Sequence, residues 1–287
     1  MNKSQYLVGN LDVAGFRDWI AQRLQGQPVP FRIGAQHYAS LPEAKAVYAW
    51  PLKAKDGLPK SHNSNPYIYP VLPRLAASSG LESNTAVLNN LQDALRTAFM
   101  GQNTLRLAGA IAGILHWGGV YTTTRGGGNK PWLARNYTRL HDLLNQVVID
   151  HASGSDVSTV SELRFNAGMT KVYALLLDDF IIYDSRVAAS LTWLALHWWR
   201  DVKNSNSIQL PAALRFGTLP PRGNARGHRN AAPGIFHEIK RAQDHYMWNV
   251  RANWLLSDAL SLAGKESQFA TLREVEAALF QMGDRVR

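Results

Sequence analysis

Apolar residues recur at helical spacing along most of the chain. In the first 25 residues they follow Asp12 at Val13, Phe16, Ile20 and Leu24. Steps of three and four residues put these side chains on one face of a helix. An aspartate just before the apolar stripe also favours a helix start. The pattern therefore predicts one N-terminal helix within residues 1–25.

Residues 26–80 break this pattern and are rich in proline. Eight of the chain's 13 prolines fall here, and proline interrupts both helices and central strands. Short extended pieces are predicted at 46–50 and 67–69. The segment is not of low complexity, so we expect an ordered wrapping segment or a small subdomain.

The helical period returns after residue 80. Asn84 is predicted to cap a helix that carries apolar residues to Phe99, and Asn103 is predicted to cap a second helix that ends at Trp117-Gly118-Gly119. A third helix is predicted over 131–150. The glycine-rich stretch 125–130 lacks the Gly-Lys-Ser/Thr ending of a phosphate-binding P-loop, so it is interpreted as a loop.

Capping signals also organise the second half of the chain. A short helix is predicted near 159–165, followed by a tight connection at 166–169 and a helix that starts at Thr170. Asp184 is predicted to cap a strongly amphipathic helix. Residues 204–233 read as a basic loop, and long helices are predicted at about 233–263 and 270–282.

These elements predict a mainly α fold with a less regular N-terminal segment. We divide the chain into the proline-rich stretch 1–80, a helical core at 81–203, and a basic loop with C-terminal helices at 204–287. The three stretches are expected to act as a single functional unit.

The composition narrows the chemistry. The sequence has no cysteine, which excludes disulfides, cysteine-ligated metals and thiol catalysis. It shows no signal-peptide pattern at Met1 and no apolar run long enough to span a membrane. We therefore expect a soluble, cytoplasmic protein with no membrane partner and no evident obligate protein partner.

The net charge of +10 comes mostly from arginine. The 31 basic residues comprise 21 arginines and 10 lysines, and there are nine tryptophans. Arginine binds phosphate with two parallel hydrogen bonds and stacks on bases. The balance therefore favours a nucleic-acid partner, although a basic protein without such a partner has the same composition.

Lys171 has unusual neighbours for a lysine. It lies at the start of a predicted helix and is followed by Val-Tyr-Ala-Leu-Leu-Leu. A helix N-terminus and partial burial both favour the neutral amine, which is the nucleophilic form. A lysine in the first turn that reaches to solvent would have no such role.

Asp184 lies 13 residues after Lys171, at the start of the next long helix. The two residues can therefore lie at neighbouring helix N-termini. A carboxylate beside a lysine can take its proton, or it can stabilise positive charge on a sugar. Plain N-capping would also explain an aspartate at this position.

Two stretches around this pair resemble a known family. They are Leu163-Arg164-Phe165-Asn166-Ala167-Gly168-Met169-Thr170-Lys171-Val172 and Ile181-Ile182-Tyr183-Asp184-Ser185-Arg186-Val187-Ala188. Together they resemble the helix-hairpin-helix DNA glycosylases, with the nearest likeness in the 8-oxoguanine glycosylase branch. The turn Trp117-Gly118-Gly119-Val120 also looks like that of free-standing prokaryotic members.

The resemblance implies a two-lobed helical fold and assigns roles to single residues. Lys171 corresponds to the family's lysine nucleophile and Asp184 to its essential aspartate. Gly168 and Thr170 of the hairpin, and Arg186 where the family has a histidine, are expected to bind DNA. A late helix would line the pocket for the flipped base, which points to His245, Tyr246 and Trp248, although packing is the alternative role for each.

The acid-free basic loop adds phosphate contacts to this expectation. Its candidates are Arg215, Arg222, Arg226 and Arg229. A solvated basic loop without DNA contacts is the alternative for these four arginines.

The resulting hypothesis is a DNA N-glycosylase that acts on a base flipped out of duplex DNA, gives an abasic site, and goes on to β-elimination if Lys171 forms a Schiff base. No cofactor or catalytic metal is expected. The substrate is either an oxidised purine or a hypermodified base of phage DNA. The rival hypothesis is a non-catalytic DNA-binding protein with the same fold.

Overall fold

The structure, a computed structural model, describes residues 1–33, 36–50, 80–123, 128–203, 209–220 and 229–284. The predictions at 67–69 and 125–127, and those for Arg222 and Arg226, lie outside the described residues. Within them the chain is mainly helical, and one short antiparallel pair of strands lies near the N-terminus.

The N-terminal half of the described chain supplies two strands and several helices. They are α1 (Lys3–Leu7), α2 (Leu11–Leu24), β1 (Phe31–Ile33), β2 (Gln36–Tyr38), α3 (Leu41–Ala46), α5 (Leu81–Met100), α6 (Thr104–Trp117), α7 (Asn129–Arg135), the 3-10 turn η2 (Tyr137–Arg139) and α8 (Leu140–Ala152).

The remaining elements follow the predicted hairpin. They are α9 (Met169–Leu176), α10 (Ser185–His197), which continues into the π-helical turn η3 (Trp198–Val202), the 3-10 turn η4 (Ala212–Leu214), α11 (Ala242–Ala263), the 3-10 turn η5 (Gly264–Glu266) and α12 (Leu272–Met282).

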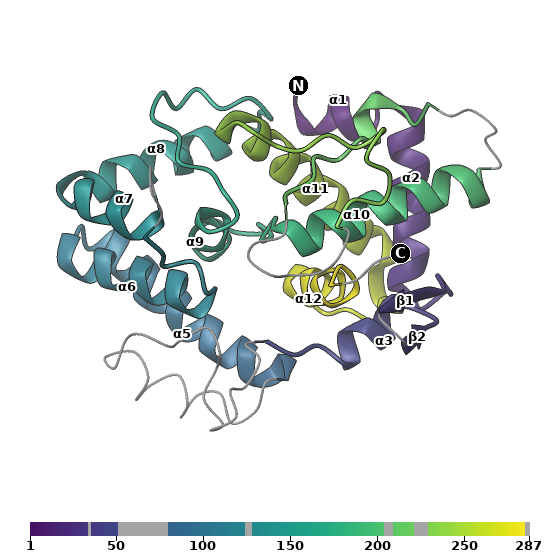
Figure 1. Cartoon of the computed structure of the whole chain (residues 1–287), viewed down its shortest axis with the longest axis horizontal. Coiled ribbons are helices and arrows are strands. Elements are labelled where there is room, and N and C mark those ends of the chain that lie inside the picture. Colours follow the sequence, from purple (N-terminus) through teal and green to yellow (C-terminus); the bar gives the residue numbers. More distant parts are fainter. Residues whose placement is uncertain (34–35, 51–79, 124–127, 204–208, 221–228, 285–287) are drawn as a thin grey trace.

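The helices form two groups that lie side by side in Figure 1. Helices α5 to α9 make one group, with α6 packed against α5, α8 and α9. The other group joins both ends of the chain, because α2 packs along α11 and α3 packs along α12. The second group therefore brings together helices of the first and the last of the three stretches defined from the sequence.

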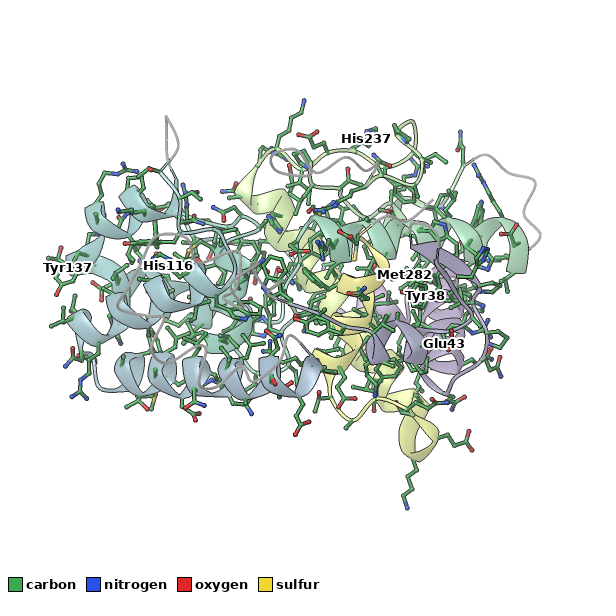
Figure 2. The ribbon with its side chains drawn as sticks, turned by 60° about the horizontal axis from the view of Figure 1, so that its bottom comes forward. Tyr38, Glu43, His116, Tyr137, His237 and Met282 are labelled. Atoms are coloured by element: carbon green, nitrogen blue, oxygen red, sulfur yellow. The ribbon has the colours of Figure 1, made fainter. Side chains whose placement is uncertain are left out.

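Side chains fill the space between the helices, as Figure 2 shows. Met282 and His116 are buried, whereas Tyr137 lies on the outer surface with 39% of its area exposed. One continuous apolar core runs through the described residues. It includes the predicted stripe of α2, whose residues Val13, Phe16, Ile20 and Leu24 are all buried.

Several predicted caps are confirmed. Asn103 accepts a hydrogen bond from the N–H of Arg106 at the start of α6, which ends at Trp117 as predicted. Asp184 caps α10. Asn84 is different, since it lies inside α5, where its side chain bonds to Gly80 and accepts from the indole N–H of Trp117.

The helix predicted near 159–165 is absent, and the helix predicted over about 233–263 begins only at Ala242, where α11 starts. Residues 159–165 are not helical, because Asp150 Oδ1 accepts from both the N–H and the hydroxyl of Thr159 and holds the chain open there. Residues 233–241 are also not helical. There the N–H of Ile239 and the carbonyl of His237 bond to the backbone of Thr218.

The other differences are breaks and omissions. The helix predicted over 131–150 is divided into α7, η2 and α8 near Asn136. The N-terminal helix is divided into α1 and α2, with Asn10 as the cap of α2. The strand predicted at 46–50 is absent, because Ala46 ends α3 and residues 47–50 follow as a turn and irregular chain.

Candidate active site

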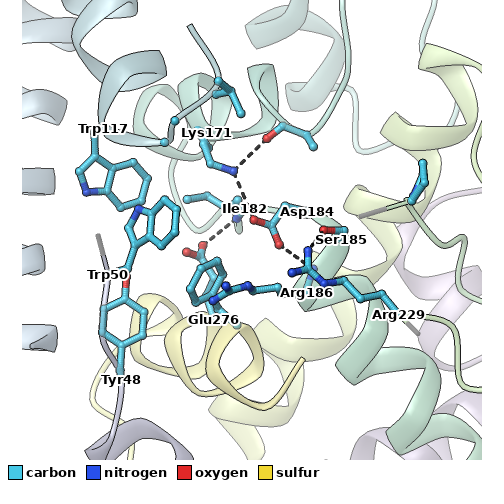
Figure 3. Close-up of a pocket in the computed structure, with 16 residues that line it drawn as sticks. Tyr48, Trp50, Trp117, Lys171, Ile182, Asp184, Ser185, Arg186, Arg229 and Glu276 are labelled. Carbon is cyan, nitrogen blue, oxygen red and sulfur yellow. Dashed lines mark hydrogen bonds and ion pairs between the residues drawn. The ribbon is translucent and has the colours of Figure 1, made fainter. Parts of the chain in front are cut away.

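A cavity of about 320 Å³ is lined by residues from both groups of helices. Its wall is formed by the N-terminal ends of α9 and α10, the inner face of α12, the end of α6, and the segment that follows α3. Figure 3 shows the side chains that face it. Both residues predicted to be catalytic, Lys171 and Asp184, are among them.

Lys171 enters the cavity from the first turn of α9. It is 5% exposed, on a helix whose residues are all buried. Its Nζ donates to the carbonyl of Ala167 at 2.9 Å and lies 3.3 Å from Asp184 Oδ2. The pair predicted from sequence is therefore in contact, within one cavity.

Gly118 makes room for this lysine. A Cβ at residue 118 would stand 2.4 Å from Lys171 Cδ and 2.8 Å from its Cε, well inside van der Waals contact. The lysine stem thus crosses the backbone at the end of α6 where no side chain can be accommodated. The glycine pair after Trp117, which the sequence marked as a helix end, also shapes the site.

The two carboxylate oxygens of Asp184 have different partners. Oδ1 accepts the N–H groups of Arg186 and Val187 at 3.0 and 3.3 Å, which caps α10, while Oδ2 faces Lys171. Burial raises the pKa of Asp184, but the Lys171 charge and the two N–H groups outweigh this and hold its pKa below the ordinary value. The carboxyl is therefore ionised at neutral pH.

Glu276 on α12 is a second acidic group of the cavity, and sequence reasoning missed it. Its Oε2 accepts the N–H of Ile182 at 2.6 Å, and it is only 8% exposed. Burial raises its pKa to about 6, although Arg273 and the N–H of Ile182 act in the opposite direction. The signal was present, because Glu276 lies on the apolar stripe of α12 between Leu272 and Phe280.

Two arginines close another side of the cavity. Arg186 Nη2 lies 2.7 Å from Asp284 Oδ1, and its guanidinium lies 4.4 Å from the ring centre of Phe280. Arg229 donates to Ser185 Oγ at 2.5 Å and shares Asp284 at 3.5 Å. Both were predicted to bind DNA, and both line the cavity with a mostly buried side chain.

Aromatic rings supply the apolar lining. Phe280 contacts Trp50 edge-on at 5.6 Å and Tyr48 at 5.9 Å, and Trp117 from the end of α6 lines the same cavity. Trp50 and Tyr48 come from the proline-rich N-terminal stretch, far from the hairpin in sequence. Nothing in their local pattern singled them out as site residues.

The hairpin residues Gly168 and Thr170 have structural partners. The N–H of Gly168 donates to Asn166 Oδ1 at 2.8 Å, and a Cβ at residue 168 would stand 2.1 Å from Asn129 Nδ2. Thr170 has no exposed surface, accepts from the N–H of Tyr183 and donates to Asn249 Oδ1 at 2.6 Å. The surface role expected for Thr170 does not fit its burial.

The three residues proposed for the base pocket are not among those that line the cavity. His245 is buried with Nε2 2.8 Å from the carbonyl oxygen of Tyr183, and burial lowers its pKa to about 4. Tyr246 has no exposed surface, and Trp248 packs on Phe216 at 5.6 Å. Apolar packing on α11 explains these positions, and other aromatic rings face the cavity.

The basic loop is described only in part. Arg215 is half-buried and donates from Nε to the carbonyl of Leu210 at 2.6 Å, outside the cavity. Of the four arginines predicted there, only Arg229 is placed at the site within the described residues. Arg222 and Arg226 are outside them.

No family model, curated protein or solved structure matches this chain. Across the described ranges, no helix combines the length and apolar character needed to cross a membrane. In the same ranges, no three His, Asp or Glu side chains gather in a group that could hold a metal ion. The cavity itself is therefore the basis on which a function can be inferred.

Proposed function

We propose that this protein is a DNA N-glycosylase of the helix-hairpin-helix type, with Lys171 as nucleophile and Asp184 as its assisting carboxylate. The observation that carries the proposal is the 3.3 Å contact between these two side chains in a cavity lined by aromatic rings and arginines. The +10 net charge of the chain suits a duplex DNA partner.

A flipped nucleotide would bring its deoxyribose to Lys171 and its base to the aromatic wall. Enzymes that act on a base in duplex DNA must extrude it into a pocket, where stacking on side chains takes the place of stacking on neighbouring bases. Trp50, Tyr48, Trp117 and Phe280 offer that surface. Arg186 and Arg229 at the rim can meet the phosphates that flank the extruded sugar.

The chemical step begins with proton transfer from Lys171. Its Nζ must lose a proton to attack, and Asp184 Oδ2 is the carboxylate oxygen in contact with it. The amine nitrogen then bonds to C1′ while the C1′–N bond to the base breaks and its electron pair leaves with the base. Asp184 is also placed to stabilise positive charge that develops on the sugar.

The covalent product of this step determines whether the DNA strand is also cleaved. Opening of the sugar ring gives a Schiff base between Lys171 and C1′, and loss of a proton from C2′ with departure of the 3′ phosphate would cut the strand by β-elimination. If water attacks in place of the lysine, only an abasic site results. Both outcomes remain within the proposed function.

Two substrate classes fit the cavity's chemistry. One is an oxidised purine, with 8-oxoguanine as the first candidate. The other is a hypermodified base of phage DNA, which would give the protein a defence role. We propose action in the cytoplasm on DNA in either case.

Base release and covalent trapping test the proposal. Purified protein is incubated with duplexes that contain 8-oxoguanine and, separately, with hypermodified phage DNA, and free base and abasic sites are measured. Borohydride added during turnover should trap a protein–DNA adduct. Lys171→Ala should abolish the adduct and any strand cleavage.

Lys45→Ala is the matched control. Lys45 is also paired with a glutamate, at 2.9 Å from Glu274, but it lies outside the cavity, so its variant should trap DNA like the wild type. Full base release without Lys171 would make water the nucleophile. DNA binding without any base release would favour the non-catalytic DNA-binding protein.

A further inference from the structure

Glu276 lines the cavity with a buried carboxyl group. The backbone N–H of Ile182 holds Oε2, and Glu276 faces the same cavity as Lys171 and Asp184 (Figure 3). The side chain is 92% buried on α12, a helix fixed by its packing on α3 and α10. Such a carboxyl is positioned in advance and is not a mobile surface group.

Glu276 also has aromatic surface beside it. Phe280 lies one helical turn further on α12, and residues four apart lie on one helix face. Both side chains line the cavity. A planar base near Phe280 and Trp50 would therefore have its edge within reach of Glu276.

The charged and titratable groups around Glu276 come from several elements. Lys171 on α9 and Arg273 on its own helix favour the ionised carboxylate, whereas Asp184 at the start of α10 opposes it. Tyr48, from the segment after α3, is buried beside it, and the Glu276 charge contributes to raising the tyrosine's pKa. Burial is the largest influence on Glu276 and favours its protonated form.

The site therefore holds two carboxyl groups in opposite environments. Asp184 accepts two backbone N–H groups and faces a cation, so it stays ionised, whereas Glu276 accepts one N–H and faces another acid. Pairs of acids whose surroundings separate their protonation states divide the roles of acid and base between them. Lys171 and Asp184 leave one role unfilled in the proposed reaction, the supply of a proton to the departing base.

We propose that Glu276 is the general acid of this site and protonates the base as it leaves. The inference rests on the proposed glycosylase function and adds a residue and a substrate property to it. When the C1′–N bond breaks, its electron pair passes to the base, and the carboxyl proton of Glu276 moves to a ring nitrogen or exocyclic oxygen of that base. The base departs neutral and Glu276 is left as a carboxylate.

This role selects a chemical class of substrate. A neutral purine or pyrimidine with an accepting atom on its exposed edge needs such a proton, since it would otherwise leave as an anion. A base that already carries a positive charge, such as a ring-alkylated purine, gains nothing from it. The structure thus favours uncharged oxidised or substituted bases over alkylated ones.

The test is the pH dependence of base release at saturating protein in a single turnover. The substrate is whichever of the 8-oxoguanine duplex and the phage DNA the wild type acts on. Because Glu276 must carry its proton, the wild-type rate should fall about tenfold per pH unit above a midpoint at or above 6. Glu276→Gln should lower the rate at about pH 5.5 by roughly 10²-fold and lose this alkaline fall, with DNA affinity unchanged.

Glu274→Gln is the control on the same helix, because Glu274 pairs with Lys45 outside the cavity. It should keep the wild-type rate and profile. A wild-type rate that stays constant from about pH 6 to 8 overturns the role of Glu276, and this result requires no variant to fold. The same alkaline fall in Glu276→Gln also overturns it.

Failure of the underlying function gives a different result. In that case the wild type releases no base from either DNA at any pH and traps no adduct with borohydride. An active wild type with a flat profile removes only Glu276 from the mechanism and leaves Lys171 and Asp184 in place.

Discussion

Two buried acidic regions of the molecule show what a carboxylate does when it is fully paired and when it is not. Asp156 is 1% exposed and accepts from the N-terminal ammonium group and from Nε and Nη2 of Arg251, at 2.8 and 2.6 Å for the arginine. It lines no part of the cavity. Because Asp156 is paired with two cations, we interpret it as a structural ion pair that holds the N-terminus against α11; it is called the structural tie below.

In the cavity, acidic groups are less completely paired with cations. Asp184 lies 3.3 Å from Lys171, whereas Glu276 is influenced by the charges of Arg273 and, less strongly, Lys171, and Arg186 is already paired with Asp284. The pKa of Asp184 is held below its ordinary value, whereas burial raises the pKa of Glu276 to about 6. Incomplete pairing of buried acids beside an open space therefore marks a reactive site better than burial alone.

The largest effect on stability should come from the structural tie. Asp156→Asn leaves the largely buried Arg251 and the terminal ammonium without their anion, so we expect a loss of about 3 kcal/mol in the free energy of unfolding. Denaturant titration measures it. Base release by the folded variant should equal that of the wild type. If the variant kept its stability but released base more slowly, Asp156 would have a catalytic role and not a structural one.

Asp184→Asn should impair base release. The rate of base release should fall by about 10²- to 10³-fold, because an amide neither accepts the lysine proton nor stabilises a cationic sugar. Asparagine keeps the helix cap and DNA affinity should change little, but the buried Lys171 loses its anion, so the free energy of unfolding should fall as well. Single-turnover assays and denaturant titration together check both halves. Unchanged base release would reduce Asp184 to a helix cap.

Glu276→Gln should stabilise the protein, with a sign that depends on pH. Folding raises the pKa of Glu276 from 4.5 to about 6, so the folded state holds this proton more tightly than the unfolded state. The wild type therefore loses stability as pH rises through this range, by about 2 kcal/mol in total. Glutamine removes that loss.

Denaturation at two pH values checks this linkage. The variant should exceed the wild type by about 1 to 2 kcal/mol at pH 8, and the difference should shrink by about that amount below pH 4.5. Glu274→Gln, on the same helix but partly exposed to solvent, should show no such rise. Equal curves for Glu276→Gln and the wild type would mean that the carboxyl is not strained by burial.

The smallest effect is expected at Arg229. Because Asp284 and Ser185 already hold this side chain, Arg229→Gln should lower the salt dependence of DNA binding by about one phosphate contact or less. Binding measured at several salt concentrations gives this slope. Arg139→Gln, an exposed arginine paired with Glu162, is the control and should leave it unchanged. A larger change in the control would move the DNA surface away from the cavity.

Local signals in the sequence predicted the parts of the fold that local forces decide. The caps Asn103 and Asp184 bond to backbone N–H groups two or three residues away, and their side-chain types alone indicate a helix start. The stripe of α2 is likewise a local pattern. These predictions are confirmed because little in the tertiary structure competes with them.

The helical prediction is wrong for residues 159–165 and 233–241, where hydrogen bonds to residues outside each segment determine the backbone conformation. Thr159 is held by Asp150 across a turn, and residues near Ile239 pair with Thr218, about twenty positions away. No helical period within 159–165 or 233–241 carries information about those partners. Tertiary hydrogen bonds therefore override the helical pattern in both segments.

For the same reason, the sequence predicted only part of the candidate site. Lys171 and Asp184 are close along the chain and each lies at a predicted helix start, so the sequence alone suggested that they lie close together. Glu276 meets Ile182 across 94 residues, and Trp50 comes from a stretch with no helical period. An acid on an apolar helix face was the one signal that could have brought Glu276 into the prediction.

The buried hydroxyl of Thr170 has a consequence for how this chain can diverge. It ties the start of α9 to the N–H of Tyr183, the residue before Asp184, and Asn249 and Asn253 hold the intervening segment at Ile181. The 13 positions from Lys171 to Asp184, which comprise the rest of α9 and its connection to α10, are therefore a segment of fixed length, anchored at Ile181 and Tyr183. Insertions and deletions are tolerated in exposed loops, but here one added residue would detach either the anchor or the carboxylate. Homologous chains should vary freely around this segment and keep its length.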